Sequence, residues 1–492
     1  MKTIQNAMAC ALALACSTTA AHAQRWTQGQ LSEARNRLTA EAVAGRAVFI
    51  GGDVGSSTPS DRIDFYDPST GIWTQSQLGL GRYSLASTVN GTTLAVAGGI
   101  NPSGNPASRV DFYDANTDTW SFDFLSARRY ALSAASVGTK MLFAGGRNNA
   151  MSNRVDIYDT VTGNWSFASL SQSRGWMGCV TVGDKVIFAG GWNGFGPSSQ
   201  VDIYDDSTGT WSTSMLSVPR YYLGAAVSDG KAVFAGGATG TTIAVSLDTV
   251  DIYDPATGVW TTSQLAAPRD SMASVSAQDK AYFYGGFETG MSPISSNRLE
   301  SFDAATGTWT NANFGTPRGD LAGAVVGGSL VFGGGIGTNG NSADAEIGEF
   351  PFGSAYCAAP AANSAGLFAE LDAYGSDDAS LNNLVIEGSG LPASAFALFL
   401  LSDTQGNTPN VGGGAGTLCL GGPIGRFNGQ VQMSDPMGRI ELDVNTSAVP
   451  HPTQGTVSIL AGQTWNFQAW YRDVVGGTAS SNLTGALSVT FQ

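Results

Sequence analysis

The chain has almost no histidine and little positive charge. Only two of its 492 residues are histidine, His22 and His451, so residues 24–353 contain none. Their absence from this stretch excludes a Ser-His-Asp catalytic triad, a His-ligated copper site and a zinc site built from His and Cys. Lys and Arg number 24 against 39 Asp and Glu, which gives a formal net charge of −15. We therefore predict no nucleic-acid partner, since such binding draws on phosphate neutralisation, and no metal or other cofactor.

Long apolar runs are also absent. No stretch beyond the N-terminal region reaches the ~18 apolar residues of a membrane helix, so we expect no transmembrane anchor. Lys2, the short apolar stretch Ala7–Ala15 and the small-x-small pattern Ala21-His22-Ala23 form an export signal over residues 1–23. Cleavage near Ala23 would leave a secreted, periplasmic or cell-surface protein. Lipid attachment at Cys16 is the alternative.

Cysteine is scarce. Two of the five cysteines lie in the signal, which leaves Cys179, Cys357 and Cys419. Because an exported chain meets an oxidising compartment, we predict a Cys357–Cys419 disulfide. Closing its 63-residue loop would be worth about 4 kcal/mol in the chain-entropy model. Cys179 lies in an apolar strand pattern and is expected to be a buried, unreactive thiol.

What the chain has in abundance is glycine and aromatic residues. Charged residues are 13% of the chain, about half the usual ~25%, whereas glycine numbers 65 and aromatic residues reach 10%. At 42% apolar the chain can bury sizeable cores. High glycine with Trp, Tyr and Phe and no long helix-forming runs predicts an all-β protein.

An internal repeat runs through residues 24–353. Its spacing is 45 to 49 residues, and it is marked by a tryptophan at positions 26, 73, 120, 165, 211, 260 and 309. A Gly-Gly pair follows every Trp by 25 and 26 residues, from Gly51-Gly52 to Gly334-Gly335. An arginine lies nine residues after each Trp, at Arg35, Arg82, Arg129, Arg174, Arg220, Arg269 and Arg318. Seven matches at fixed offsets cannot arise by chance.

A period near 47 residues with four short strands is typical of a β-propeller blade. In the first unit we expect strands at Leu38–Ala44, Arg46–Gly51, Ile63–Asp67 and Ile72–Ser76. Each Trp would fill the gap between adjacent blades, and the Gly-Gly pair would end a strand where a side chain would crowd neighbouring backbone. The Gly-Gly, Tyr-Asp, Trp and Arg positions resemble the kelch-repeat family over about 330 residues.

The two ends of the repeat predict how the ring closes. Trp26 has no strand of its own unit before it, and the last unit has Glu346–Phe350 but no Trp after it. The segment Trp26–Leu31 should therefore supply the outermost strand of the seventh blade. This removes two exposed sheet edges. The prediction is a seven-bladed propeller closed by an N-terminal strand.

A second domain is expected over residues 354–492. Short alternating stretches separated by Gly, Asn and Pro indicate a small antiparallel β-sandwich. They lie at Leu384–Glu387, Phe396–Leu401, Arg439–Val444, Val457–Leu460, Trp465–Tyr471 and Leu487–Phe491. The segments Thr417–Gly422 and Thr464–Asp473 resemble an accessory module of secreted proteins of environmental bacteria. Trp465, Phe467, Ala469 and Tyr471 share one strand face, which is either sandwich core or a carbohydrate-stacking platform.

The repeated arginines allow two interpretations. They precede the innermost strand of each blade, so all seven could ring the mouth of the central channel and bind carboxylates or phosphates. The resemblance to kelch propellers that bind acidic peptides implies such contacts. Alternatively, each arginine is part of the scaffold and pairs with an acid of the third strand, at Asp64, Asp111, Asp156, Asp202, Asp251 or Glu300.

Residues that break the repeat are the better candidates for ligand specificity. They lie in the loops expected at the same face: Arg147, Trp176, Trp192, Phe195, Tyr222, Asp270 and Asp320. Further ligand candidates there directly follow their Arg: Tyr83, Tyr130 and Tyr221. Aromatic faces there can stack on sugars or side chains.

The main functional hypothesis is a secreted, monomeric, non-catalytic binding protein. Its ligand would be acidic, a carbohydrate or a protein partner at the face that bears the Arg and aromatic residues. One alternative is a metal-free carbohydrate-active enzyme using Asp270, Asp320 or Glu288, because some exported bacterial kelch propellers isomerise sialic acids. The other is a structural envelope protein.

Overall fold

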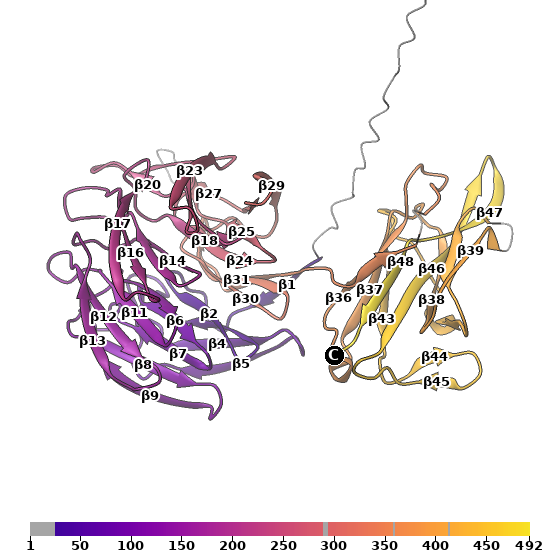
Figure 1. Cartoon of the computed structure of the whole chain (residues 1–492), viewed down its shortest axis with the longest axis horizontal. Coiled ribbons are helices and arrows are strands. Elements are labelled where there is room, and N and C mark those ends of the chain that lie inside the picture. Colours follow the sequence, from indigo (N-terminus) through magenta and orange to yellow (C-terminus); the bar gives the residue numbers. More distant parts are fainter. Residues whose placement is uncertain (1–24, 289–293, 358–359, 412–413) are drawn as a thin grey trace, which may run out of the picture.

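The computed structural model describes residues 25–288, 294–357, 360–411 and 414–492. The expected export signal, with Cys10 and Cys16, lies outside these residues. Seven four-stranded antiparallel sheets occupy the part of the propeller region that is described. They surround a common centre (Figure 1). The chain is a β-propeller followed by β-sandwich strands, as the sequence predicts.

The seven blades share one topology, in which four strands pair in order from the channel outward. The first blade consists of β2 (Thr39–Val43), β3 (Arg46–Ile50), β4 (Arg62–Asp67) and β5 (Ile72–Gln77), and the second of β6 (Ala86–Asn90), β7 (Thr93–Ala97), β8 (Arg109–Asp114) and β9 (Thr119–Phe124). The third consists of β10 (Ser133–Val137), β11 (Lys140–Ala144), β12 (Arg154–Asp159) and β13 (Trp165–Ser169), the fourth of β14 (Gly178–Val182), β15 (Lys185–Ala189), β16 (Gln200–Asp205) and β17 (Thr210–Met215), and the fifth of β18 (Gly224–Ser228), β19 (Lys231–Ala235), β22 (Thr249–Asp254) and β23 (Val259–Gln264). The sixth consists of β24 (Ala273–Ala277), β25 (Lys280–Tyr284), β28 (Arg298–Asp303) and β29 (Thr308–Asn313), and the seventh of β30 (Ala322–Val326), β31 (Ser329–Gly333), β34 (Asp344–Glu349) and the N-terminal strand β1 (Arg25–Gln30). Short hairpins add β20 (Ala238–Thr239) with β21 (Val245–Ser246), β26 (Phe287–Glu288) with β27 (Ile294–Ser295), and β32 (Ile336–Gly337) with β33 (Gly340–Asn341).

The first strand of the propeller closes the ring. β1 pairs antiparallel with β34 over six residues, from Arg25 opposite Glu349 to Gln30 opposite Asp344. Trp26 stacks on Phe314, with ring centroids 3.7 Å apart. Its ring also fills the space where Gly348 has no side chain. The two ends of the repeat therefore meet in one blade, as predicted.

The repeated tryptophans pack between adjacent blades. Trp211 of β17, for example, joins a cluster that contains Ile157 of the third blade and Phe188 of the fourth. Each of the other six repeat tryptophans borders a different cluster of this kind. The sequence thus repeats once for each interface between blades. Most of the apolar side chains that the propeller buries lie in these interfaces.

The Gly-Gly pairs hold each blade to the next one. Gly51 has φ +61°, and a Cβ placed on it would lie 2.5 Å from the carbonyl oxygen of Arg82. The amide of Gly52 donates to that same carbonyl at 2.9 Å. The equivalent bond recurs around the whole ring and ends with Gly335 donating to Arg35 at 2.8 Å. Both the positive φ and the close approach require glycine.

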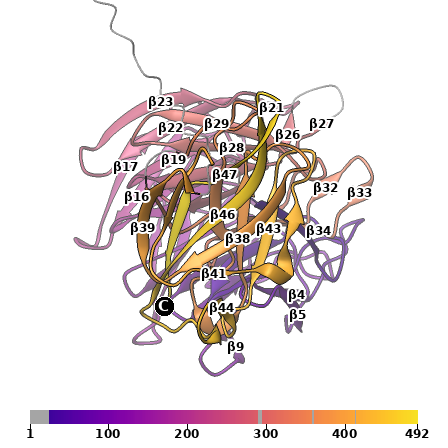
Figure 2. The ribbon, with the colours of Figure 1, turned by 90° about the vertical axis from the view of Figure 1, so that its right-hand side faces the viewer.

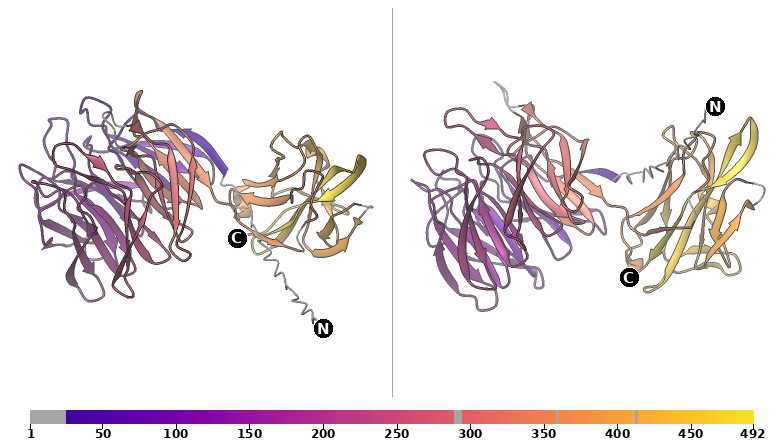
Figure 3. Two further views of the ribbon diagram at one scale, coloured as in Figure 1. Left: turned by 90° about the horizontal axis from the view of Figure 1, so that it is seen from above. Right: turned by 45° about the horizontal axis from the view of Figure 1, so that its top comes forward.

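The strands after residue 353 form separate sheets. The larger sheet contains β35 (Ser354–Tyr356), β38 (Phe396–Ser402), β41 (Gly425–Arg426), β42 (Gln432–Met433), β46 (Thr464–Val475), β47 (Thr478–Leu483) and β48 (Ala486–Thr490). The others are formed by β36 (Glu370–Tyr374), β37 (Leu384–Ser389) and β43 (Ile440–Val444); β39 (Gln405–Pro409) and β40 (Thr417–Leu420); and β44 (Val449–His451) and β45 (Gly455–Val457). The 3₁₀ turns include η1 (Ala379–Leu381) and η3 (Asn428–Gln430). Figure 3 shows these strands beside the propeller, and Figure 2 shows them in front of it. The domain boundary at residues 353/354 stays a prediction.

The sandwich strands are close to those expected, with one exception. Val457–Leu460 is not a strand, because β45 ends at Val457 and Leu460 is exposed. Trp465, Phe467, Ala469 and Tyr471 are all buried in the core between the sheets. The interpretation of this face as sandwich core is thus confirmed, and that of a stacking platform is wrong.

Two of the cysteines are paired as the sequence predicts, whereas Cys179 is only partly buried. Cys357 and Cys419 form a disulfide with their Cα atoms 6.1 Å apart. The thiol of Cys179 packs at the edge of an interblade cluster, where burial raises its pKa and keeps it protonated. In the described part of the chain, no helix has the length and apolarity needed to cross a membrane.

We predict that Trp26→Ala destabilises the propeller by about 3 kcal/mol, because it opens the contact that closes the ring. The measurement is denaturant unfolding followed by circular dichroism. Thr27→Ala, at an exposed position of the same strand, is the matched control and should change the free energy of unfolding by less than about 0.5 kcal/mol. Equal unfolding curves for the two variants would show that β1 does not close the ring.

Candidate functional site

The seven repeated arginines lie inside the blades. Each is at most 1% exposed, and each forms an ion pair with the acid of the third strand of its own blade. In the sixth blade, Arg269 donates to Glu300 at 2.7 Å and to the carbonyl oxygens of Gly285 and Arg298, both at 2.8 Å. The second oxygen of the Glu300 carboxylate accepts the amide of Ala266 at 2.7 Å. The arginine therefore ties three segments of a blade together.

The expectation that Arg35, Arg82, Arg129, Arg174, Arg220, Arg269 and Arg318 contact a ligand is wrong. Their terminal Nη groups donate to carboxylates and backbone carbonyls, and the side chains are closed to solvent. The Nε atoms of six of them are buried without a hydrogen-bond partner among the described residues. Burial lowers the pKa of Arg35, and the charge of Asp64 counteracts this. The alternative, a scaffold role with the third-strand acids, is what the structure shows. The sequence analysis missed only the partner of Arg318, which is Glu346.

A closed ring of backbone hydrogen bonds lies next to these arginines. The residue two positions after each arginine has φ between 51° and 56°, although none of the seven is glycine. Its amide donates to the carbonyl of the equivalent residue in the preceding blade, at 3.0–3.2 Å. The members are Arg37, Ser84, Ala131, Trp176, Tyr222, Ser271 and Asp320. We call this set the collar. Left-handed backbone costs energy in such residues and is often found at ligand clamps.

The collar surrounds a cavity of about 660 Å³ at the mouth of the channel. All seven collar residues line it, together with Tyr83, Tyr130, Asp270, Phe287 and packing residues beneath them. This volume lies within the ~300–1,000 Å³ of small-molecule sites. The backbone of the collar is thus the same in every blade, whereas its side chains differ from blade to blade.

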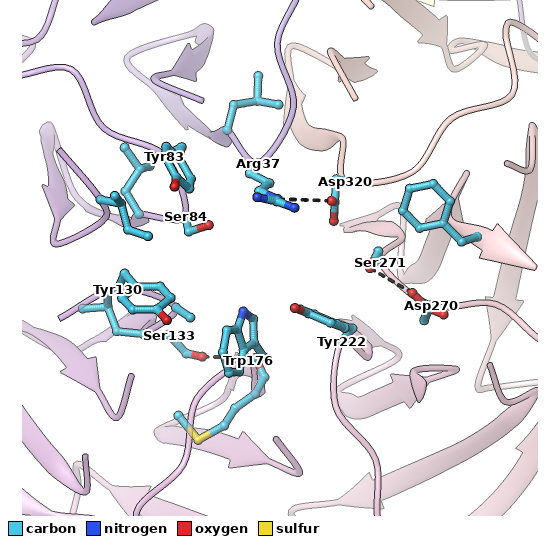
Figure 4. A pocket seen from close by; sticks show the side chains of 17 residues that line it. Arg37, Tyr83, Ser84, Tyr130, Ser133, Trp176, Tyr222, Asp270, Ser271 and Asp320 are labelled. Carbon is cyan, nitrogen blue, oxygen red and sulfur yellow. Dashed lines mark hydrogen bonds and ion pairs between the residues drawn. The ribbon is translucent and has the colours of Figure 1, made fainter. Parts of the chain in front are cut away.

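One side of the cavity is aromatic. Trp176 makes edge contacts with Tyr130 and Tyr222, with ring centroids 6.0 and 5.8 Å apart. The series continues outward through Tyr221, which contacts Trp192 at 5.3 Å. Figure 4 shows Tyr130, Trp176 and Tyr222 along one edge of the opening, with Tyr83 above them. Edge contacts fix these rings and leave faces for a ligand.

The other side is charged. The guanidinium of Arg37 lies 3.6 Å from the carboxylate of Asp320 and 4.0 Å from that of Asp53. Asp270 accepts hydrogen bonds from Ser246 at 2.6 Å and from Ser271 at 2.9 Å. Figure 4 shows Asp320, Ser271 and Asp270 in sequence along this edge. Burial raises the pKa of both Asp270 and Asp320, and their mutual repulsion adds to it at Asp320.

Six of the aromatic and acidic candidates are brought together at the cavity. They are Tyr83, Tyr130, Trp176, Tyr222, Asp270 and Asp320. The other candidates do not line it: Trp192 and Tyr221 extend the aromatic series, Arg147 bonds through its backbone to Tyr130, and Phe195 is 92% exposed on an outer loop. Glu288 lies on β26 outside the lining.

The sequence analysis missed Arg37, Ser84 and Ser271. They occupy the same repeat position as Trp176, Tyr222 and Asp320, eleven residues after a Trp. The available signal was the diversity of side chains at one fixed offset of an otherwise uniform repeat. In the described residues, no group of three or more His, Cys, Asp or Glu is arranged to hold a metal ion.

Comparison with known proteins finds a known motif in part of the propeller. A family model described as the kelch motif matches residues 128–169, 177–214 and 219–263. A solved structure titled "Structure of YjhT" is similar at 17% identity, covers 58% of this chain and 99% of that chain, and has a TM-score of 0.48. No curated protein matches the chain significantly. The fold is a β-propeller, and its third, fourth and fifth blades match the kelch motif.

We predict that Arg129→Met lowers the free energy of unfolding by about 3–5 kcal/mol, since Asp156 would keep a buried charge without its partner. Arg128→Met is the matched control, because Arg128 is exposed, and its effect should stay below about 0.5 kcal/mol. Chemical denaturation of the two variants measures the difference. A stable Arg129→Met protein would contradict the scaffold role.

Proposed function

We propose that the protein is a non-catalytic recognition protein that binds a carbohydrate in the cavity at the channel mouth. The observation that carries this proposal is the division of the cavity into an aromatic side and a hydrogen-bonding side. A sugar ring presents apolar C–H faces and a rim of hydroxyl groups. Its face would stack on Trp176 or Tyr222, while Arg37, Asp320 and the hydroxyls of Ser84 and Ser271 would bind the rim.

We no longer expect an acidic ligand. That expectation depended on seven arginines at the channel mouth, and all seven are buried and paired with acids. Arg37 is the one cationic side chain among the described residues that line the cavity. A protein partner at the same face remains an alternative, since kelch propellers mediate protein binding. Export to the cell surface or beyond also remains a proposal, with which the Cys357–Cys419 disulfide agrees.

Trp176→Ala should weaken carbohydrate binding by about tenfold, because it removes a stacking face worth about 1.4 kcal/mol. Titration calorimetry against neutral, acidic and amine-bearing oligosaccharides measures this. Phe195→Ala is the matched aromatic control, since Phe195 is exposed outside the cavity, and should bind like the wild type. If no oligosaccharide binds, or if both variants lose binding equally, the proposal fails.

An enzymatic role is a second candidate, favoured by the two carboxyl groups that share the cavity. Burial raises the pKa of both carboxyl groups, which brings them closer to the range in which a carboxyl group acts as a general acid. This alternative predicts that NMR detects slow conversion of a bound sugar, and that Asp270→Asn or Asp320→Asn lowers the rate at least ~100-fold. A bound sugar that stays unchanged over days leaves the recognition role.

A further inference from the structure

The charged side of the cavity has more negative than positive groups. Asp270 and Asp320 line the cavity, and Asp53 lies just outside it, whereas the single cation of the lining is Arg37. Arg37 is placed between Asp320 and Asp53. The phenol groups of Tyr221 and Tyr222, which also face these acids, are neutral, and burial raises their pKa further. The site therefore carries a net negative charge.

Arg37 neutralises Asp320 only in part. Their 3.6 Å separation exceeds the 2.7–3.2 Å of a good hydrogen bond. The side chain of Arg37 is 47% exposed, and that of Asp320 is 26% exposed. A second donor can thus reach Asp320 from solvent. Asp270 is 8% exposed and already accepts from two serines, so it acts on a ligand through its charge.

The opposite side of the cavity also favours a cation. Aromatic faces attract ammonium and guanidinium groups through the ring quadrupole, by about 0.5–2 kcal/mol. Trp176 and Tyr222 are collar residues like Asp320, and Tyr222 directly precedes Ser271 and Asp320 around the ring. At a greater distance, the −15 net charge of the chain attracts cations. Carboxylates and aromatic faces act on such a group together.

We propose that the sugar bound in the cavity is an amino sugar, with its protonated amine held between Asp320 and the faces of Trp176 and Tyr222. This inference rests on the proposed function and names the substrate class of that site. The hydroxyl groups of the sugar keep the contacts described above, and the amine supplies the positive charge that the site lacks.

The test compares three tetrasaccharides of the same linkage in the full-length protein: glucosamine, N-acetylglucosamine and glucose oligomers. Calorimetry at low salt should show the glucosamine oligomer binding at least tenfold more tightly than the other two. Asp320→Asn should lower the affinity for the glucosamine oligomer much more than the affinity for the glucose oligomer, so that the preference falls to less than about twofold. Asp184→Asn removes the same charge from an exposed position at the other end of an innermost strand, and it should keep the preference.

The pH profile gives a second readout. The preference should fall at high pH as the amine loses its proton. It should also fall at low pH as Asp320 takes up a proton, at a pH above the usual range of an aspartate because its pKa is raised. Binding of the glucose oligomer should lack the high-pH decrease.

The outcomes separate the two proposals. Equal binding of the three oligomers would overturn the amino-sugar inference and leave carbohydrate recognition standing, whereas no binding by any of them, or by acidic oligosaccharides, would overturn both. Tetralysine is included as a charge control. If it binds as tightly as the glucosamine oligomer and Trp176→Ala does not reduce either affinity, the attraction is nonspecific and the inference fails.

Discussion

The buried arginine of each blade is the interaction on which the rest of the propeller depends. Its guanidinium joins the second and third strands to the loop that enters the blade, and its carbonyl accepts the Gly-Gly amide of the preceding blade. An unpaired charge at such a depth would be costly, so the acid of the third strand must accompany it. The arginine thereby fixes the backbone that carries the collar two residues later.

This arrangement separates stability from recognition. Residues at the Trp, Gly-Gly and Arg positions are the same in every unit because they form the same interfaces seven times. The collar position is free to differ, since only its backbone takes part in the hydrogen-bonded ring. Trp176, Tyr222, Ser271, Asp320 and Arg37 follow one another around that ring and give the cavity its chemistry.

The fold was predictable because the same contacts within and between blades recur with each repeat of the sequence. The strands of the first blade lie within about one residue of those expected, and the closing strand forms where the unfinished end units require it. The site was less predictable. An arginine that recurs in every repeat shows that its position is constrained by structure or by function. Periodicity alone does not tell whether the arginine forms a buried ion pair or contacts a ligand. The importance of Arg37 and Ser271 became visible only with the collar, whose backbone bonds join residues about 47 positions apart.

A crystal structure of the protein with a glucosamine oligomer tests the central claim most directly. The account predicts density for the sugar at the channel mouth, with a ring against Trp176 or Tyr222 and its nitrogen within hydrogen-bonding distance of Asp320. Density on the outer strands or on the sheets after residue 353, with an empty channel mouth, would contradict it. The collar would then be a structural device of the propeller and not a binding site.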